Sequence, residues 1–236
     1  MSLRLYLTSA IWAAIAWSQV ADAQPPGDFE RAVELLDNGN LRLAFPQFLA
    51  LAERGDARAQ FNVAMLYNTG RGVEQNPSEA AKWFRRAAEQ GEPTSQFNLG
   101  YMYKNGRGVP RDAREAAEWY RRSALQGVPD AQFNLAQMYA RGDGVLKDET
   151  KASALYKPAA EQGYVMAQRQ LGLRLAIGQG VERDEVEAFK WLSLAAASGD
   201  ETASKGLQSV TQRLTASQLA DAADRLARWK LNGKPD

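Results

Sequence analysis

The chain has 236 residues, 45% of them hydrophobic, and a formal net charge of +1. A balance this close to neutral argues against binding by general attraction to nucleic acid or to an anionic membrane, because both need a basic excess. The sequence contains no cysteine and no histidine. These two absences exclude disulfides, thiolate and imidazole metal sites, cysteine nucleophiles and histidine acid–base catalysis.

The N-terminal residues 1–23 have the pattern of a secretory signal peptide. An arginine precedes an apolar run over residues 5–17, and Ala21-Asp22-Ala23 is a small-residue cleavage site. The apolar run is shorter than the roughly 20 residues that a membrane-spanning helix needs. We therefore expect cleavage between Ala23 and Gln24, no stable membrane insertion afterwards, and a periplasmic or secreted mature protein. An uncleaved N-terminal anchor is the alternative.

Residues 24–55 are predicted to form a divergent first repeat and N-terminal cap. Asp28 can serve as the N-cap of a first helix, which Asn38-Gly39-Asn40 ends. A second helix follows and contains Pro46. This proline is compatible with the helix only if the helix begins near Leu43, because a proline in the first turn costs no backbone hydrogen bond.

A segment of 36 residues recurs four times over residues 56–199. A fixed period of this length indicates a repeat protein, in which each unit is one supersecondary element. Each copy divides into two helices, because apolar residues recur in steps of three and four on both sides of a loop with two glycines. No unit can bury its apolar face alone, so stability must come from stacking on neighbours. The copies are marked by Gln60, Gln96, Gln132 and Gln168 in the first helix, and by Asn76, Asp112, Asp148 and Asp184 at the start of the second.

The third copy departs from this pattern in its second helix. Leu155 replaces a tryptophan that the other copies carry, and Pro158 lies inside the helix. A proline there removes a backbone hydrogen bond and is expected to kink the helix. Two interpretations remain open: a variant tolerated near a helix end, or a bend that sets the curvature of the array.

After residue 199 the pattern of the four copies changes. One helix is expected over residues 202–214, and a second follows a capping box at Thr215-Ala216-Ser217-Gln218 and carries an apolar stripe to Trp229. A solenoid needs a terminal element that covers its last open face. We interpret residues 200–236 as this C-terminal helical cap.

The recurring residues resemble the Sel-one-like repeat family, a group of short tetratricopeptide-like helical repeats, in its bacterial secreted type. The resemblance implies an all-α fold: a right-handed α-solenoid of stacked helix-turn-helix repeats with terminal caps. Such repeats serve as adaptors in many unrelated pathways, so the resemblance does not name a partner. In the second copy it is carried by Gln96, Leu99, Gly100, Tyr103, Gly106, Gly108, Val109, Asp112, Ala116, Trp119, Ala124 and Gly127.

In tetratricopeptide-like folds the first helix of each repeat lines the concave face, so the resemblance places a candidate binding stripe on these helices. Phe61, Phe97 and Phe133 would form an aromatic ladder for a ligand, as aromatic residues are enriched in interfaces. The alternative is that these rings pack between adjacent first helices, since apolar stripes at helical spacing are more often core. The candidate concave binding face consists of Phe61, Met65, Asn68, Phe97, Tyr101, Lys104, Phe133, Gln137 and Arg169.

Basic residues occur at two further places in the repeats. Arg71 and Arg107 lie in the loops between the two helices, where they could hold a carboxylate or a phosphate, or could be solvated charges at helix ends. The pairs Arg85-Arg86 and Arg121-Arg122 lie on the second helices among glutamates. We interpret these pairs as a charged outer face.

These observations predict a non-catalytic scaffold or adaptor in the cell envelope, which binds an unidentified protein or peptide on the concave face. The alternative is a peptidoglycan- or glycan-associated envelope factor, because aromatic faces and loop arginines can stack sugars and hold carboxylates. Enzyme activity is not expected: S-x-x-K, K-T-G and phosphate-binding loop motifs are missing, and no motif places a pair of carboxylates. We expect no catalytic residues, cofactor, metal or nucleic-acid partner.

Overall fold

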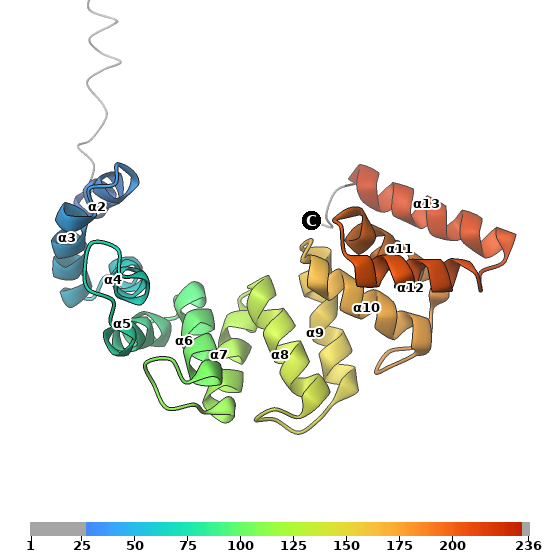
Figure 1. The fold of residues 1–236 in the computed structure, drawn as a ribbon, viewed down its shortest axis with the longest axis horizontal. Coiled ribbons are helices and arrows are strands. Elements are labelled where there is room, and N and C mark those ends of the chain that lie inside the picture. Colours follow the sequence, from blue (N-terminus) through green and yellow to red (C-terminus); the bar gives the residue numbers. More distant parts are fainter. Residues whose placement is uncertain (1–26, 233–236) are drawn as a thin grey trace, which may run out of the picture.

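The computed structural model describes residues 27–232, which form twelve α-helices and no β-strand (Figure 1). None of these helices is both long enough and apolar enough to cross a lipid bilayer. The predicted signal peptide and its cleavage point lie outside the described residues. The helices are α2 (Asp28–Asp37), α3 (Leu41–Glu53), α4 (Ala57–Thr69), α5 (Pro77–Glu89), α6 (Pro93–Asn105), α7 (Ala113–Leu125), α8 (Pro129–Arg141), α9 (Glu149–Glu161), α10 (Val165–Ile177), α11 (Glu185–Ala197), α12 (Glu201–Thr211) and α13 (Ala216–Asn232).

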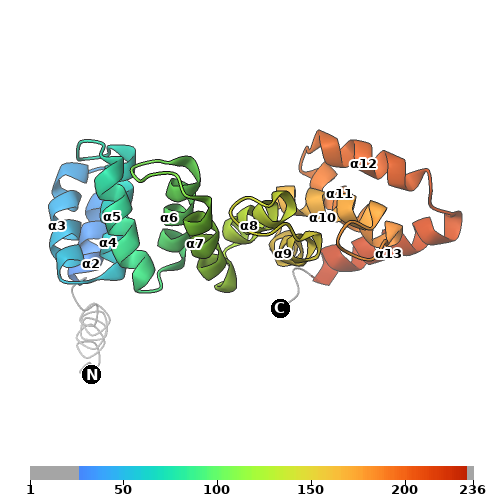
Figure 2. The same cartoon turned by 90° about the horizontal axis from the view of Figure 1, so that it is seen from below.

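The helices form a crescent whose two ends rise on the same side (Figure 1). From α2 to α12, helices that are consecutive in the chain pack against one another. Helices α4 and α6 lie towards the inner side of the crescent, and α5 and α7 stand in front of them when the molecule is seen from below (Figure 2). The predicted all-α solenoid of stacked helix-turn-helix units is confirmed.

The helices begin at the same 36-residue spacing as the sequence repeat. Helices α4, α6, α8 and α10 begin at residues 57, 93, 129 and 165, and each is the first helix of a unit. Helices α5, α7, α9 and α11 are the second helices of the same units. Helix α12 begins at residue 201, again 36 residues on, and so occupies the place of a first helix in a fifth unit.

Short polar side chains and glycines fix where these helices begin and end. The Asp112 side chain, at the N-cap of α7, accepts hydrogen bonds from the backbone N–H groups of Arg114 and Glu115 at 2.8 and 3.1 Å. These bonds satisfy donors that the first turn leaves free. Asn76 caps α5 with two such bonds, and Asp148 and Asp184 each accept one at the start of α9 and α11. The first helices α4, α6, α8 and α10 end at glycines with positive φ, which are Gly70, Gly106, Gly142 and Gly178.

The second glycine of each loop anchors one unit on the unit before it. At Gly108, where φ is 72°, an added Cβ would lie 2.1 Å from the carbonyl oxygen of Pro77, in the first turn of α5. Gly144 and Gly180 lie equally close to the first turns of α7 and α9. A side chain at these positions would force the loop away from the preceding helix, so the close approach requires glycine.

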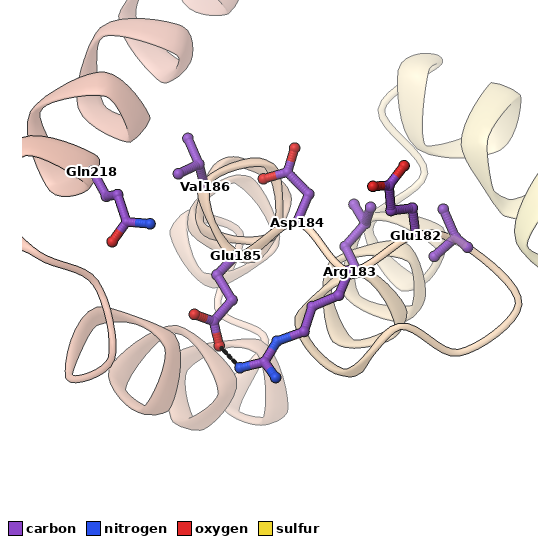
Figure 3. A pocket seen from close by; sticks show the side chains of 8 residues that line it. Glu182, Arg183, Asp184, Glu185, Val186 and Gln218 are labelled. Carbon is purple, nitrogen blue, oxygen red and sulfur yellow. Dashed lines mark hydrogen bonds and ion pairs between the residues drawn. The ribbon is translucent and has the colours of Figure 1, made fainter.

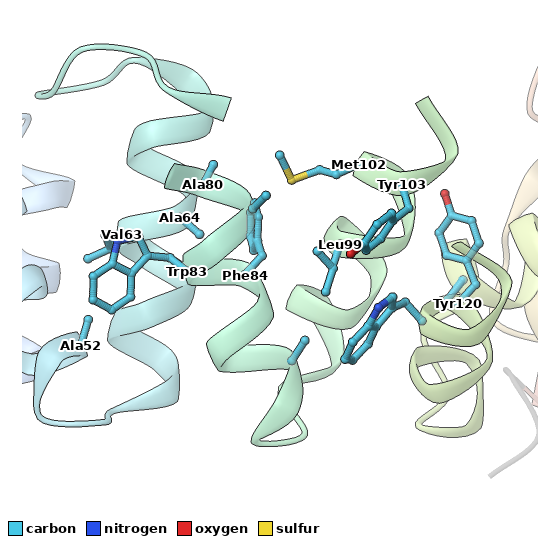
Figure 4. Close-up of a cluster of buried hydrophobic side chains, with 14 of the residues drawn as sticks. Ala52, Val63, Ala64, Ala80, Trp83, Phe84, Leu99, Met102, Tyr103 and Tyr120 are labelled. Carbon is cyan, nitrogen blue, oxygen red and sulfur yellow. The ribbon is translucent and has the colours of Figure 1, made fainter. Parts of the chain in front are cut away.

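Small and large side chains alternate between the packed helices (Figure 4). Ala59, Ala80 and Ala88 are buried and let the helix backbones approach. Trp83 lies beside Val63 and Ala52, while Phe84 lies on the side of α5 that faces α6. Each large buried apolar side chain contributes roughly 1.5–3 kcal/mol. Because the core continues from one unit into the next, the units stabilise one another.

Buried glutamines fix the register between units. Gln96, near the start of α6, donates from Nε2 to the carbonyl oxygen of Ala88 in α5 at 3.1 Å. Its Oε1 accepts a hydrogen bond from Gln126, the residue after α7, at 2.9 Å. Gln60 and Gln132 make the same two kinds of bond. A shift in register would leave these buried amides without partners, at a cost of about 1–3 kcal/mol each.

Two details of the divergent first unit differ from the prediction. Gly27, and not Asp28, is the N-cap of α2; Asp28 lies in the first turn, where a carboxylate is favourable. Helix α3 begins at Leu41, earlier than expected, so Pro46 lies inside the helix rather than in its first turn. The proline removes the usual partner of the Arg42 carbonyl oxygen, and Arg42 is an exposed residue.

The second helix of the third unit continues through Pro158. The backbone N–H of Gln162 donates to the Pro158 carbonyl oxygen at 3.2 Å, so the last turn closes normally beyond the proline. Ala154, whose carbonyl loses its partner to the proline, is exposed. The predicted kink stays a prediction, and so does its effect on curvature.

Helix α13 does not pack as the second helix of a fifth unit would. In the four units before it, the second helix packs against the first helix of its own unit, whereas α13 packs on α11. The Trp229 ring lies edge-on to the Trp191 ring with centroids 5.0 Å apart, and the Lys190 ammonium lies over both rings. The exposed side chains along α12 are polar and give no apolar face for another unit: Glu201, Thr202, Ser204, Lys205, Gln208 and Ser209.

Candidate functional site

The candidate binding stripe is far from uniform in its exposure. Tyr101 is the one exposed member, with 46% of its surface accessible. Phe133 is 4% exposed and belongs to the core, which corrects its assignment to an open binding face. The remaining members are half-buried: Phe61, Met65, Asn68, Phe97, Lys104, Gln137 and Arg169.

The three phenylalanines pack against second helices. Phe61 contacts Phe84 with ring centroids 6.1 Å apart, and Phe97 contacts Tyr120 at 5.7 Å. In both cases the partner lies on the second helix of the same unit. The rings therefore take part in the packing of their own units and do not stand free as an aromatic ladder.

Phe133 makes a second aromatic contact that the other two phenylalanines lack. It packs against Tyr156 of α9 at 5.7 Å and against Tyr164, the N-cap residue of α10, at 5.1 Å. Burial and the neighbouring Asp130 raise the pKa of Tyr164 to about 12. Because two rings enclose Phe133, a ligand on the inner side cannot reach it without displacing them.

Tyr101 and Lys104 form the accessible centre of the stripe. They lie one turn apart on α6, and the Lys104 Nζ donates to Asn134 Oδ1 on α8 at 2.9 Å. Burial, and then the nearby Arg141, lower the pKa of Lys104. The centre thus offers the Tyr101 ring, the Lys104 ammonium held between α6 and α8, and the exposed side chain of Arg141.

Beneath this centre lies a buried hydroxyl with no hydrogen-bond partner. Tyr120 of α7 is fully buried, and its hydroxyl is unpaired within the described part of the chain. The ring rests on the backbone of α6, because a Cβ added at Gly100 would lie 2.9 Å from Tyr120 Cδ1. Burial, and then neighbouring Tyr101, raise the pKa of Tyr120 well above the ordinary tyrosine value.

The two ends of the stripe are engaged in structural contacts. Arg169 of α10 forms an ion pair with Asp200, the N-cap of α12, at 2.9 Å. At the other end, the Asn68 carbonyl oxygen accepts hydrogen bonds from Arg107 at 3.0 Å and from Gln75 at 2.8 Å. Arg107, predicted as part of a basic rim, therefore links the loop of the second unit to α4.

Sequence reasoning missed a buried arginine between the third and fourth units. Arg174 is 6% exposed, its Nη1 lies 2.9 Å from Glu149 Oε2, and its guanidinium lies over the Tyr156 ring. This contact, and to a smaller extent Lys147, lower the pKa of Glu149. An alignment of the four copies would have singled out Arg174, because the equivalent residues in the other copies are apolar: Leu66, Met102 and Met138.

A hollow of about 600 Å³ opens where the last full unit meets α13 (Figure 3). Gln218 of α13 faces the first turn of α11 across it. Glu185 on that turn accepts hydrogen bonds from Arg183 at 2.8 Å and Arg213 at 2.5 Å, which lower its pKa. Its charge is thus already compensated. No group of three or more metal-ligating side chains occurs within residues 27–232.

Comparison with known proteins agrees with the geometry of the repeats. A family model described as Sel1 repeat matches residues 57–92, 93–128, 129–164 and 165–200. The chain is similar to a solved Sel1 repeat protein from Oxalobacter formigenes, with 32% sequence identity and a TM-score of 0.71 over 75% of this chain and 73% of that chain. It is also similar to c5321, a protective antigen present in uropathogenic Escherichia coli strains and displaying an SLR fold, with 30% identity and a TM-score of 0.50 over 83% of this chain and 52% of that chain. No curated protein sequence matches the chain.

Proposed function

Because the chain belongs to the Sel1 repeat family, whose members are generally protein-interaction scaffolds, we propose that it is a non-catalytic scaffold that binds a protein or peptide along its inner side. The observation that carries this proposal is Tyr101, whose ring is 46% exposed on α6 in the middle of the array. An accessible tyrosine among half-buried neighbours is the kind of residue that dominates binding energy at interfaces.

The residues around Tyr101 suit an extended peptide segment. Lys104 and Gln137 offer hydrogen-bond donors on neighbouring first helices, and Met65 offers an adaptable apolar surface on α4. Phe97 supports this surface from below rather than contacting the ligand as a free ring. A contact of this size fits micromolar affinity, about −8 kcal/mol.

The proposal includes a location in the cell envelope or outside the cell. It is supported by the signal-peptide pattern over residues 1–23 and by the absence of cysteine, which suits an oxidising compartment. Detection of a mature N-terminus at Gln24 in a periplasmic or culture-medium fraction would support the location. An intact N-terminus in the cytoplasm would contradict it.

In-cell photo-crosslinking tests the inner side as the binding surface. One variant carries the photoreactive residue at Tyr101 on α6, and a matched control carries it at Leu125 on α7, which is 82% exposed. We expect a discrete protein adduct from position 101 and none from position 125. The adduct identifies the partner by mass.

A second measurement ties the adduct to the tyrosine ring. With the captured partner, Tyr101→Ala should weaken binding at least tenfold, and Leu125→Ala should leave it unchanged. Adducts from position 125 alone would overturn the inner-side proposal. Retention of the protein on purified cell-wall sacculi, without any protein adduct, would favour the glycan-associated alternative instead.

A further inference from the structure

Helix α5, the second helix of the first full repeat (residues 56–91), bears a cleft of about 420 Å³ that the inner-side proposal does not use. It lies between α5 and the loop that joins α6 to α7. Ala81 and Val109 supply apolar surface in the cleft, and Lys82, Arg85 and Arg86 supply three cationic side chains from neighbouring turns of α5. A volume of this size is typical of a small-ligand site.

Both guanidinium groups at this cleft are held in position. Arg85 donates to the Tyr103 hydroxyl and lies over the Tyr103 ring, and Arg86 lies over the Trp83 ring with its Cζ 4.4 Å from the centroid. Within residues 27–232, neither guanidinium forms an ion pair, so both charges are uncompensated. A planar guanidinium that is already oriented loses little entropy when it binds an oxyanion in two-point fashion.

The opposite wall of the cleft is rigid. Gly108 presses against the Pro77 carbonyl, as described above, and this contact fixes the loop that contributes Val109. The cleft is therefore formed before any ligand arrives, which removes a conformational cost from binding.

The equivalent positions on the other second helices lack this charge. On α7, Glu118 stands where α5 has Lys82, and it forms an ion pair with Arg121 at 2.5 Å. On α9 the three equivalent residues are Ala154, Lys157 and Pro158. Two arginines without an ion-pair partner within residues 27–232, next to a lysine instead of a glutamate, are thus particular to α5. Lys82 itself pairs with Glu79 at 2.6 Å, but both side chains reach the solvent.

We propose that the cleft on α5 binds a small organic anion, a carboxylate or phosphate group carried on an apolar body. The oxyanion would meet Arg85, Arg86 and Lys82, and the apolar body would rest on Val109, with the buried Ala81 at the base of the cleft. The sequence suggested only a charged outer face for Arg85 and Arg86. The structure adds the enclosing loop, the fixed guanidinium groups and the contrast with α7.

Titration of the purified protein with phenyl phosphate and with phenylacetate, followed by the arginine Nε–Hε signals in NMR, tests this site. We expect saturable shifts at Arg85 and Arg86, with Arg121 and Arg122 on α7 unmoved as the control within the same molecule. The tighter of the two probes identifies the oxyanion. Inorganic phosphate alone should bind at least tenfold more weakly than the tighter probe, because it lacks the apolar body.

Two charge variants complete the test. Lys82→Glu copies the arrangement of α7, which folds in this chain, and should weaken probe binding at least tenfold. Glu118→Lys should give Arg121 and Arg122 saturable shifts of their own. Parallel shifts of both arginine pairs in the unaltered protein, or unchanged affinity in Lys82→Glu, would overturn the proposal as non-specific attraction. Neither variant alters Tyr101, so failure here is separate from failure of the inner-side proposal.

Discussion

At the scale of single residues, equivalent positions in the four units differ where the surroundings differ. One such position is held by Phe84, Tyr120, Tyr156 and Leu192, all of them buried. The Arg174 guanidinium lies over the Tyr156 ring, whereas the Tyr120 hydroxyl has no hydrogen-bond partner within residues 27–232. A buried polar group without a partner costs about 1–3 kcal/mol. The second unit therefore carries a cost that its neighbours avoid.

Replacement of Tyr120 by phenylalanine should raise the free energy of unfolding by about 1 kcal/mol, because it removes the unpaired hydroxyl and keeps the ring. Urea unfolding measures the change. The matched control is Tyr103→Phe, which removes a hydroxyl that accepts a hydrogen bond from Arg85 and should cost about 0.5–1.5 kcal/mol. Equal destabilisation by both variants would mean that the Tyr120 hydroxyl has a partner.

Tyr120→Phe should also change how the free energy of unfolding depends on pH. Burial raises the pKa of Tyr120 in the folded protein, so folding favours the neutral phenol. This contribution is fully present below the unfolded tyrosine pKa of about 10 and is lost as the pH rises above it. Between about pH 9 and about pH 11, Tyr120→Phe should thus lose less stability than the unaltered protein. If the free energy of unfolding falls with pH equally in Tyr120→Phe and in the unaltered protein, the Tyr120 hydroxyl is not buried and neutral as described.

At the scale of elements, the loops between the two helices of each unit act as joints between units. Gly144 combines a φ of 68° with a close approach, because a Cβ there would lie 2.3 Å from the Ala113 carbonyl oxygen. Gly127 has a φ of 86° but nothing within 4 Å of its added Cβ. Substitutions at these two glycines therefore distinguish two costs. Both carry the cost of a strained backbone, and only Gly144 also carries the cost of disturbed packing between units.

Gly127→Ala should cost about 1–2 kcal/mol through the left-handed backbone alone. Gly144→Ala should cost about 1–3 kcal/mol more, because the methyl group must push the loop off the first turn of α7. Chemical denaturation gives both values. Hydrogen exchange should show faster opening at the start of α7 in Gly144→Ala only. Equal costs for the two substitutions would show that the loop can move away freely.

At the scale of the whole molecule, the period of the sequence was enough to predict the solenoid, and the family resemblance is confirmed. Periodicity identifies Gln60 and its equivalents as repeat positions, and the structure shows that all four are buried. Periodicity could not decide between surface and core for Phe133, because that depends on Tyr164, which replaces the Glu92 and Val128 found at the same distance after Phe61 and Phe97. Likewise, the cleft on α5 depends on a loop contributed by the next unit. Structural features that two units form together cannot be predicted from the residue pattern of a single unit.

Because the helices pack in a nearly linear order, a destabilising substitution should affect only the helices near it. Trp229→Ala removes the ring that α13 places on Trp191 and Lys190, and should cost about 2 kcal/mol because this ring is half-buried. Each unit contacts only its neighbours, so hydrogen exchange should accelerate in α10 to α13 and stay unchanged in α4 to α7. The control is Leu231→Ala on the same helix, where 83% exposure limits the effect to about 0.5 kcal/mol. Acceleration along the entire array would instead mean that the units open as one cooperative block. In that case the inner side around Tyr101 would depend on the C-terminal helices, although α6 packs on α5 and α7.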